Sequence, residues 1–428
     1  MLVVFTAFLL ANLPASVFVL WLVPGVAQLE AAAWLILALI AVVVLRGEGS
    51  LRESWAGLAT AWMLLPLVLY SGLSSIWSVD WQVSLARWIV LCATIFVGGW
   101  IGLRLDPKRI ARHLGVYCSA FLFISVMLVL FAPHVGVMNY YDIQGAWKGI
   151  YWHKNHMGLL AAFACTVFLV NGIGALQMRT KSSWAWAVLY LLSLFFVVQT
   201  DSVAAYLTLI VMHGLILLLV VHQHLRKRLK PLHYGAAALI LVLVIAAIGA
   251  NLDRVFGAFN RNTSLTGRVP MWGHLFDIYL SERPLFGYGF NAFWHIESYR
   301  VTMGQVAGYP DPIVIADNGF IDLLVNTGYV GLALFLVFYV GLWWRSARYA
   351  WNAVDIHGLF PLITMAYILI ANLTWSLIFE NEGFFMLIMI ALLFSMTVNQ
   401  ETGERGLLAI GKPSTERPRD RADSTVSA

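Results

Sequence analysis

The chain alternates between long apolar stretches and short polar segments. An α-helix needs about 20 predominantly apolar residues to cross the hydrocarbon core of a membrane. Twelve stretches are predominantly apolar and nearly free of charged side chains, and we predict a membrane span in each: 1–29, 31–45, 54–79, 88–103, 113–141, 155–178, 182–200, 202–225, 231–252, 318–344, 356–379 and 383–400. The two shortest, 31–45 and 88–103, are flanked by charged side chains that can reach the membrane interface.

Two details of this pattern decide the span count. The stretches 182–200 and 202–225 are separated only by Asp201, which predicts a tight helical hairpin. The first stretch begins MLVVFTAFLL and lacks the basic region of a secretory signal, so we expect it to be the first span.

Composition supports the same class. Hydrophobic residues make up 61% of the 428 residues and charged residues 11%, whereas soluble domains have about 45–50% and about 25%. We therefore expect an all-α integral membrane protein with about twelve transmembrane helices.

The basic residues indicate an orientation. If the N-terminus is cytoplasmic, 19 of the 27 Lys and Arg residues fall in inner loops or in the C-terminal tail, as the positive-inside rule requires. A miscounted hairpin would reverse the downstream loops and remove this asymmetry. Both termini are therefore predicted to be cytoplasmic.

Outside the spans, two segments stand apart. Residues 253–317 form the longest loop, with 65 residues, and are predicted to be periplasmic, between helices 1–9 in 1–252 and helices 10–12 in 318–400. Loops of this length are usually functional. The segment 401–428 is charged and poor in aromatic residues, which predicts a disordered cytoplasmic tail.

The long loop contains a predicted amphipathic helix. In VPMWGHLFDIYL, apolar residues recur at spacings of three and four, with Thr266 as the candidate N-cap and Pro284 after the helix. The sequence FGYGFNAFW (286–294) then predicts a tight turn lined by rings. Its Tyr288 and Trp294, together with Trp272, suit either a membrane-interface belt or a surface that binds sugar rings.

Eight basic residues fall on the outer side, which the positive-inside rule disfavours: Arg87, Lys148, Lys154, Arg254, Arg261, Arg268, Arg283 and Arg300. A single cation at the end of a helix is usually an interface anchor. Lys154 differs, because His153, Asn155 and His156 crowd it in YWHKNHMG at the start of a span. A lipid-linked pyrophosphate would lie at this depth, and Lys and Arg are suited to bind it.

Other chemistry has less support in the sequence. No acidic residue or third His stands at helical spacing from His153 and His156, so we expect no metal site, and no motif predicts a cofactor. The three cysteines lie within predicted spans and form no disulfide framework. Asp317 precedes the span 318–344, where it is a candidate general base or, with Asn318, a helix N-cap.

Four segments resemble the bacterial O-antigen ligase and polysaccharide polymerase superfamily. They occur in the expected order: LSSIWSVDWQVSLARW (73–88), GIYWHKNHMGLLAAF (149–163), TGRVPMWGHLFDIYLSERPLFGYGFNAFW (266–294) and DNGFIDLLVNTGYVGLALF (317–335). The HKN sequence is most similar to exopolysaccharide polymerases.

The resemblance implies glycosyl transfer at the periplasmic face of the inner membrane. The donor would be an oligosaccharide on undecaprenyl pyrophosphate, used without a metal and with inversion at the anomeric carbon. Lys154 and Arg268 match the functional basic residues of the family, with Arg87 as a third, and would hold the pyrophosphate. His153, Asn155 and His156 would orient it or contact the acceptor.

The acceptor distinguishes a polymerase from a ligase. Ligases of this family carry a His near the position of Asp317, and a carboxylate with its ordinary pKa of about 4 is a weaker base than imidazole. This departure favours a polymerase, which transfers the glycan to another lipid-linked repeat unit, over a ligase that transfers it to lipid A-core. Proteins that regulate chain length or export the product are further candidate partners.

The alternative from another class is a twelve-span secondary transporter. Transporters tend to contain two related halves and ionisable residues at mid-membrane. The chain shows no repeat of its first half, and the predicted spans carry few charges, so an enzyme is favoured.

Overall fold

The computed structural model describes residues 4, 6–8, 32–41, 62–140, 143–225, 267–378 and 383–410, with side chains described as far as residue 397. Most of the predicted first span, the span 231–252, the loop residues 253–266 and the tail beyond 410 lie outside the described residues. The twelve-span count therefore stays a prediction.

Helices dominate this part of the chain. Five are long and apolar enough to cross a membrane, by length and composition: α6 (Trp81–Arg104), α7 (Pro107–Phe131), α9 (Lys154–Gln177), α11 (Val203–Leu225) and α16 (Gly319–Trp351). The other labelled helices are α5 (Leu65–Leu73), η1 (Ser74–Ile76), α8 (Pro133–Gly136), α10 (Ser183–Gln199), α14 (Arg268–His274), η2 (Leu275–Leu280), η3 (Phe293–His295), α15 (Glu297–Ala307), η4 (Ile356–Leu359), α17 (Phe360–Asn372) and α18 (Phe384–Ile410). The prediction of a helical membrane protein is confirmed.

Polar residues mark where several helices begin. Asp80 caps α6 by accepting from the amide of Val83 at 3.2 Å, and Asp106 caps α7 by accepting from the amide of Arg109 at 2.7 Å. Such caps satisfy amides that have no partner inside the helix. The predicted hairpin at Asp201 is also present, between α10 and α11.

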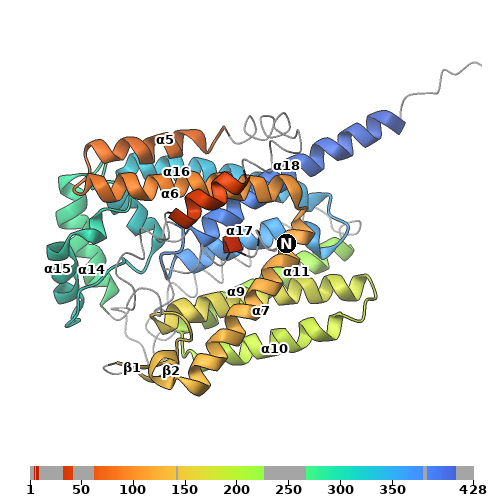
Figure 1. The fold of residues 1–428 in the computed structure, drawn as a ribbon, viewed down its shortest axis with the longest axis horizontal. Helices are drawn as coiled ribbons and strands as arrows, with labels where there is room; N and C mark the ends of the chain where they lie inside the picture. Colours follow the sequence, from red (N-terminus) through yellow and green to blue (C-terminus); the bar gives the residue numbers. More distant parts are fainter. Residues whose placement is uncertain are drawn as a thin grey trace, which may run out of the picture.

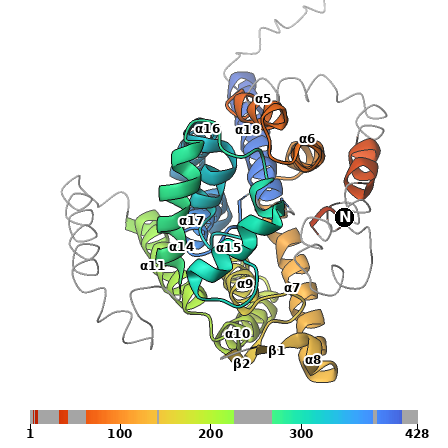
Figure 2. The same cartoon turned by 90° about the vertical axis from the view of Figure 1, so that its left-hand side faces the viewer.

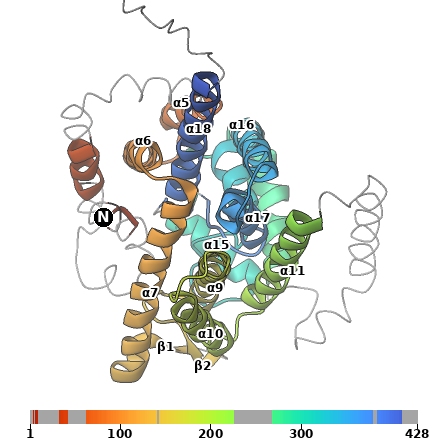
Figure 3. The same cartoon turned by 90° about the vertical axis from the view of Figure 1, so that its right-hand side faces the viewer.

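Helix α9 lies at the centre of one part of the bundle. It packs against α7, α10 and α11, which lie on three sides of it in Figure 3. Its sequence is apolar on all sides, and most of its side chains are buried. A helix that is apolar all round is expected in the core of a bundle.

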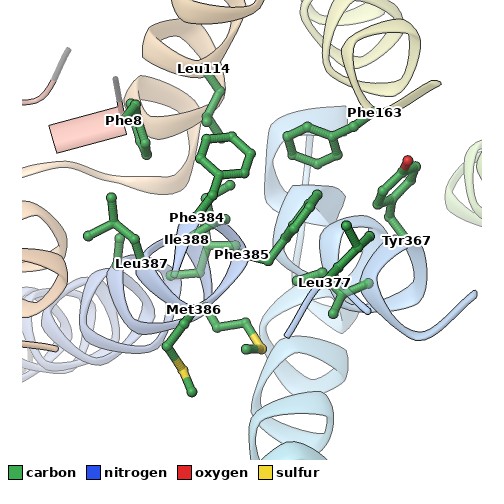
Figure 4. Packing of buried hydrophobic residues seen from close by; sticks show 14 of the residues in the cluster. Phe8, Leu114, Phe163, Tyr367, Leu377, Phe384, Phe385, Met386, Leu387 and Ile388 are labelled. Carbon is green, nitrogen blue, oxygen red and sulfur yellow. The ribbon is translucent and has the colours of Figure 1, made fainter. Parts of the chain in front are cut away.

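A cluster of rings joins this part to α18. Phe384 and Phe385, at the start of α18, lie between Phe8 on one side and Phe163 and Tyr367 on the other (Figure 4). Helix α18 then runs beside α6. The packing of aromatic rings ties segments from both ends of the chain into one core.

The structure differs from the sequence prediction at a β-hairpin. Strands β1 (Val137–Tyr140) and β2 (Ile143–Trp147) pair antiparallel where we predicted the end of a span and a loop. Helix α7 ends at Phe131 because Pro133 follows, and the residue before a proline disfavours the helical conformation. Trp147 anchors the hairpin on Phe196 of α10, with ring centroids 5.1 Å apart.

Two predicted spans are interrupted. Helix α17 ends at Asn372, whose side-chain oxygen accepts from the amide of Leu377 at 2.8 Å, whereas the span was predicted to reach 379. Helix α16 is broken at Gly328, which has φ 66° and ψ −175°. Both interruptions lie near the candidate site described below.

Candidate functional site

The described part of the long loop covers one end of the helix bundle. Helices α14 and α15 lie together at this end (Figure 1) and are seen in front of α9 and α17 in the end-on view (Figure 2). The hairpin β1–β2 lies toward the same end (Figure 1). The functional residues predicted from the sequence are all found here.

Lys154 is buried, with 4% of its side chain exposed. Its Nζ donates to the backbone oxygen of Asp201 at 2.8 Å and to the Asp201 carboxylate at 3.1 Å. The carboxyl side chain of Asp201 itself is 72% exposed. A buried ammonium is therefore held at the α10–α11 turn by a carboxylate that remains in contact with solvent.

Arg268 is the first residue of α14 and pairs with Asp317. Its Nε lies 2.9 Å from Asp317 Oδ2, with 18% and 25% of the two side chains exposed. Asp317 is not the helix cap, since Asn318 accepts from the amides of Phe320 and Ile321. Burial raises the pKa of Asp317 above its ordinary range, and the neighbouring Arg268 opposes this shift.

Two predictions about α14 have different outcomes. The residue before the helix is Gly267, in a left-handed conformation, so it takes the N-cap position that we predicted for Thr266, which lies outside the described residues. Trp272 is part of the helix as predicted. Its indole donates to the backbone oxygen of Ala316 at 2.7 Å, which fixes the segment that leads to Asp317.

His153 lies among the positive charges. Its pKa is lowered to about 3, first by burial and then by the charges of Lys154, Arg268 and Lys148. The imidazole is therefore neutral near pH 7. Its Nδ1 accepts from the amide of Asn155 at 3.1 Å, so Nε2 carries the proton and is a hydrogen-bond donor.

Asn155 and His156, which follow Lys154 in α9, make contacts that hold the start of this helix in place. Ser202 donates to Asn155 Oδ1 at 3.1 Å, which ties α9 to the start of α11. The ring of His156 is buried and stacks on Tyr151, with ring centroids 4.6 Å apart. Both residues lie next to the cation cluster, which we define as Lys148, Lys154 and Arg268 around His153.

Trp375 forms one wall of the cluster. Its ring stacks on His153 at 5.4 Å with an interplanar angle of 21°, and it also contacts His156. The chain places Trp375 here because α17 ends at Asn372. The cluster therefore combines α9, α14 and the segment that follows α17.

The GYG turn of the loop binds to the break in α16. The amides of Tyr288 and Gly289 donate to the oxygens of Val325 and Asn326 at 3.1 and 2.8 Å. In return, the amide of Tyr329 donates to Pro284 O at 2.9 Å. The break frees these backbone groups, and a broken membrane helix is tolerated where neighbouring segments satisfy them in this way.

The segment 74–84 holds the other side of this turn. Ser74 Oγ accepts from the amide of Phe290 at 3.0 Å, and the Ser84 hydroxyl donates to Phe290 O at 2.9 Å. Tyr288 is 1% exposed, and its ring packs on Tyr279 and Phe293. We therefore assign Tyr288 to the packing of the loop rather than to contact with substrate.

A pocket of about 250 Å³ lies between the loop and α16. It is lined by Phe290, Asn291, Trp294, His295, Arg300, Val314, Ile315, Gly319, Asp322, Leu323, Asn326, Thr327 and Ser376. Trp294 is the predicted sugar-binding residue that reaches it. The indole of Trp294 donates to Asp322 Oδ1 at 2.5 Å, which fixes the plane of the ring.

Asp322 is buried and connects the pocket to the rest of the site. Besides Trp294, it accepts from the amide of Ala316 at 3.0 Å and from the hydroxyl of Ser376. Ser376 follows Trp375 in sequence, and Ala316 precedes Asp317. The pocket and the cation cluster are therefore neighbours built on shared segments.

Arg87 belongs to the pocket side of the site. The pKa of His295 is lowered by burial first and then by the positive charge of Arg87, with Asp80 opposing and Arg300 adding to the effect. The charges that act on His153 are instead Lys148, Lys154 and Arg268. Of the three basic residues predicted to be functional, Lys154 and Arg268 thus belong to the cation cluster, and Arg87 lies near the pocket.

Three important residues escaped the sequence prediction. Asp322, Trp375 and Ser376 lie in stretches that we interpreted as uninterrupted spans. The available signals were a carboxylate in NGFIDLLVNTG and the polar residues of ANLTWS, both unusual inside a membrane span. In the part of the chain that the structure describes, no group of three or more His, Cys, Asp or Glu residues could hold a metal ion.

Comparison with known proteins gives two matches. A family model described as O-antigen ligase matches residues 188–336, which include Arg268, Asp317 and Asp322. The chain is also 24% identical over 303 residues to the exopolysaccharide production protein ExoQ of Rhizobium meliloti (strain 1021), a match that covers 66% of this chain and 64% of that protein. The chain thus matches slightly less than two thirds of that relative's length. Both matches confirm the resemblance to the O-antigen ligase and polysaccharide polymerase superfamily.

Proposed function

We propose that this membrane protein, a relative of O-antigen ligases and of an exopolysaccharide production protein, is a polysaccharide polymerase. It transfers an oligosaccharide from undecaprenyl pyrophosphate to the acceptor sugar of another lipid-linked repeat unit. The reaction takes place at the periplasmic face of the bacterial inner membrane, and it is inverting and metal-independent.

The cation cluster is the observation that carries this proposal. Lys148, Lys154 and Arg268 lie close enough to lower the pKa of His153, and this occurs at the end of the bundle that α14 covers. Cations beside an interface are costly unless they meet anions. Lys154 and Arg268 are each paired with one carboxylate in this structure, and a pyrophosphate whose lipid tail lies in the bilayer would add further anionic oxygens to the cluster.

The cluster suits a leaving pyrophosphate. Arg and Lys donate charge-assisted hydrogen bonds to phosphate oxygens, and His153 adds a neutral N–H donor at Nε2. As the bond between the anomeric carbon and the phosphate oxygen breaks, the bonding electron pair stays on the pyrophosphate. The positive charges stabilise this developing charge most strongly in the transition state.

Asp317 is the proposed base. The acceptor hydroxyl attacks the anomeric carbon from the face opposite the pyrophosphate, and its proton passes to the Asp317 carboxylate. Asp317 lies beside Arg268 with a raised pKa, which makes it a better base than an ordinary carboxylate. Attack from the opposite face accounts for inversion.

A ligase that uses lipid A-core as the acceptor is the second candidate. The description of the matching family, O-antigen ligase, favours it, whereas the name of the relative favours exopolysaccharide production. We rank the polymerase first because Asp317 occupies the position near which ligases of the family carry a His. Neither match supports the transporter alternative.

Substitution of the two central cations tests the proposal. We expect Lys154→Ala and Arg268→Ala each to lower the rate of polymer formation by about 10²–10³, because each removes an electrostatic contact to the leaving group. The amount of protein in the membrane and its thermal unfolding in detergent are measured alongside. Arg348→Ala, at the far end of α16, is the matched control and should retain the wild-type rate.

The decisive measurement uses the purified protein with the host's own undecaprenyl-pyrophosphate oligosaccharide as the sole substrate. A ladder of lipid-linked multimers that forms in the presence of a chelator supports the polymerase. Transfer that occurs only after lipid A-core is added would establish the ligase instead. A wild-type rate for the folded Lys154→Ala or Arg268→Ala variant would refute the site assignment.

A further inference from the structure

The pocket beside the cation cluster has its own chemistry. Two rings, Phe290 and Trp294, and two amides, Asn291 and Asn326, face a space of about 250 Å³. Pockets for drug-sized ligands span roughly 300–1,000 Å³, so this one suits a single small ring better than a long chain. Aromatic faces beside amide groups are suited to binding a sugar ring.

The Trp294 ring is held in a fixed orientation. Its indole nitrogen donates to Asp322, and Asp322 is held in turn by Ala316 and Ser376. Asp322 therefore has three donors around its two oxygens, so it positions Trp294 instead of pairing with a cation. A ring fixed before binding lowers the entropic cost of holding a ligand.

Arg300 is the unsatisfied group in this pocket. It lies on α15, its Nε is buried, and among the described residues this nitrogen has no hydrogen-bond partner. Ion pairs in the same part of the chain involve other basic residues, including Lys154 and Arg268. A buried N–H donor that has no acceptor costs free energy until an acceptor binds, and the cost is larger when the donor belongs to a charged group.

The surroundings of Arg300 are positive. His295 lines the same pocket, and both Arg87 and Arg300 lower its pKa, while the opposing Asp80 has a smaller effect than Arg87. The acidic residue that lines the pocket, Asp322, accepts hydrogen bonds from Trp294, Ala316 and Ser376 and has no ion pair with Arg300 among the described residues. An anionic group on a ligand would therefore be attracted to Arg300.

We propose that this pocket binds a sugar that carries a carboxylate, such as a uronic acid, with Arg300 paired to the carboxylate and Trp294 against the ring. A guanidinium matches the two oxygens of a carboxylate in geometry. The inference rests on the proposed function, because it makes the pocket the site for one sugar of the repeat unit. It names the substrate class as an acidic oligosaccharide.

Binding of simple glycosides to the full-length protein in detergent tests this proposal. Methyl β-glucuronide and methyl β-glucoside differ only in the carboxylate, and saturation-transfer NMR can measure the binding of both. We expect the glucuronide to bind at least tenfold more tightly. In Arg300→Gln the preference for the glucuronide should be lost, whereas Trp294→Leu should weaken the binding of both glycosides.

Arg348→Gln makes the same change of charge at the far end of α16 and should keep the preference. Equal binding of both glycosides to the wild type would overturn the proposal. So would displacement of the glucuronide by inorganic pyrophosphate in wild type and Arg268→Ala alike, since the pocket would then be a phosphate site.

The binding assay requires no turnover, so it separates this inference from the proposed function. If the wild type makes polymer but shows no preference between the glycosides, only the acidic-sugar inference fails. If the preference is present but the purified protein makes no polymer and transfers no glycan, the proposed function fails and the pocket assignment stands.

Discussion

Two cations of the site, Lys154 and Arg268, are each held by a carboxylate that is at least partly exposed. Lys154 is buried, but its partner Asp201 is largely exposed, and the pair of Arg268 and Asp317 is partly buried. Removing one partner of a deeply buried pair leaves an uncompensated charge, which is strongly destabilising. Under the proposed function, a phosphate oxygen would take over from either carboxylate, and the two carboxylates stabilise the cations in the absence of substrate.

The proposed role of Asp317 as the base predicts a pH dependence of the reaction. A base must be ionised, and burial raises the pKa of Asp317, so activity should be full above this raised pKa and fall as the pH drops through it. Asp317→Asn should lower kcat by about 10²–10⁴ and remove this acidic limb from the residual activity. Initial rates measured from about pH 4 to 8 would show the limb.

Asp317→Glu is the matched variant. It keeps a carboxylate at this position and should therefore retain an acidic limb in the pH profile. His153 is not the source of the acidic limb, because the pKa of His153 is about 3 and its ring stays neutral from about pH 4 to 8. An acidic limb that persists unchanged in Asp317→Asn would show that another group titrates and that Asp317 only positions Arg268.

At the scale of elements, the site depends on interrupted helices. The break at Gly328 exposes backbone groups of α16 to the GYG turn, and the early end of α17 brings Trp375 to His153. An uninterrupted helix would use those backbone groups internally and would keep residues 373–376 within the bundle. The interruptions therefore attach the loop and complete the wall of the cation cluster.

Gly328 offers a direct test of the break. Its φ of 66° is strained for other residues, and an added Cβ would meet the backbone of Leu285. We expect Gly328→Ala to lower the thermal stability of the protein in detergent and to reduce polymer formation. Gly214→Ala in α11 is the control, because its Cβ meets open space and alanine favours a helix interior by about 0.5–1 kcal/mol.

Stability is followed by unfolding in detergent, with the fluorescence of the tryptophans as the signal. If Gly328→Ala and Gly214→Ala unfold at the same temperature, the contact between the GYG turn and α16 does not contribute to stability as described.

At the scale of the whole molecule, the bundle gathers distant segments at one end. The segments 73–88, 149–163, 267–294 and 317–335 are far apart in sequence, yet they meet around the cation cluster and the pocket (Figure 2). Antiparallel packing of α9, α10 and α11 places Lys154 and Asp201 at the same end. A lipid-linked substrate would reach this end from the bilayer surface.

The proposed orientation can be checked by chemical labelling of introduced cysteines. Gln144 in β2 and Lys181 before α10 are both exposed and belong to opposite ends of the bundle. A membrane-impermeant maleimide should label Gln144→Cys from the periplasm in spheroplasts, and Lys181→Cys only after the membrane is opened. Cys92, Cys118 and Cys165 are replaced by serine in the background, and the reverse pattern would invert the proposed topology.

The sequence was sufficient for the class of fold and for selecting several residues of the candidate site. Long apolar stretches predict membrane helices because the bilayer admits few other structures, and the predicted hairpin at Asp201 and the loop helix from Arg268 are present. Lys154, Arg268, Asp317 and Trp294 could be selected because polar or aromatic groups at the ends of apolar stretches are costly or conspicuous. Their catalytic and binding roles remain proposals.

Tertiary structure alone decided the partners of these residues. Lys154 pairs with Asp201, 47 residues away in sequence, and Arg268 with Asp317, 49 residues away. The wall of the cation cluster brings Trp375 onto His153, from a segment more than 200 residues away. The broken helices could not be predicted because hydrophobic patterning reports which residues avoid water and not whether another segment will satisfy a freed backbone group. For that reason Asp322, Trp375 and Ser376 became visible only once the helices were packed.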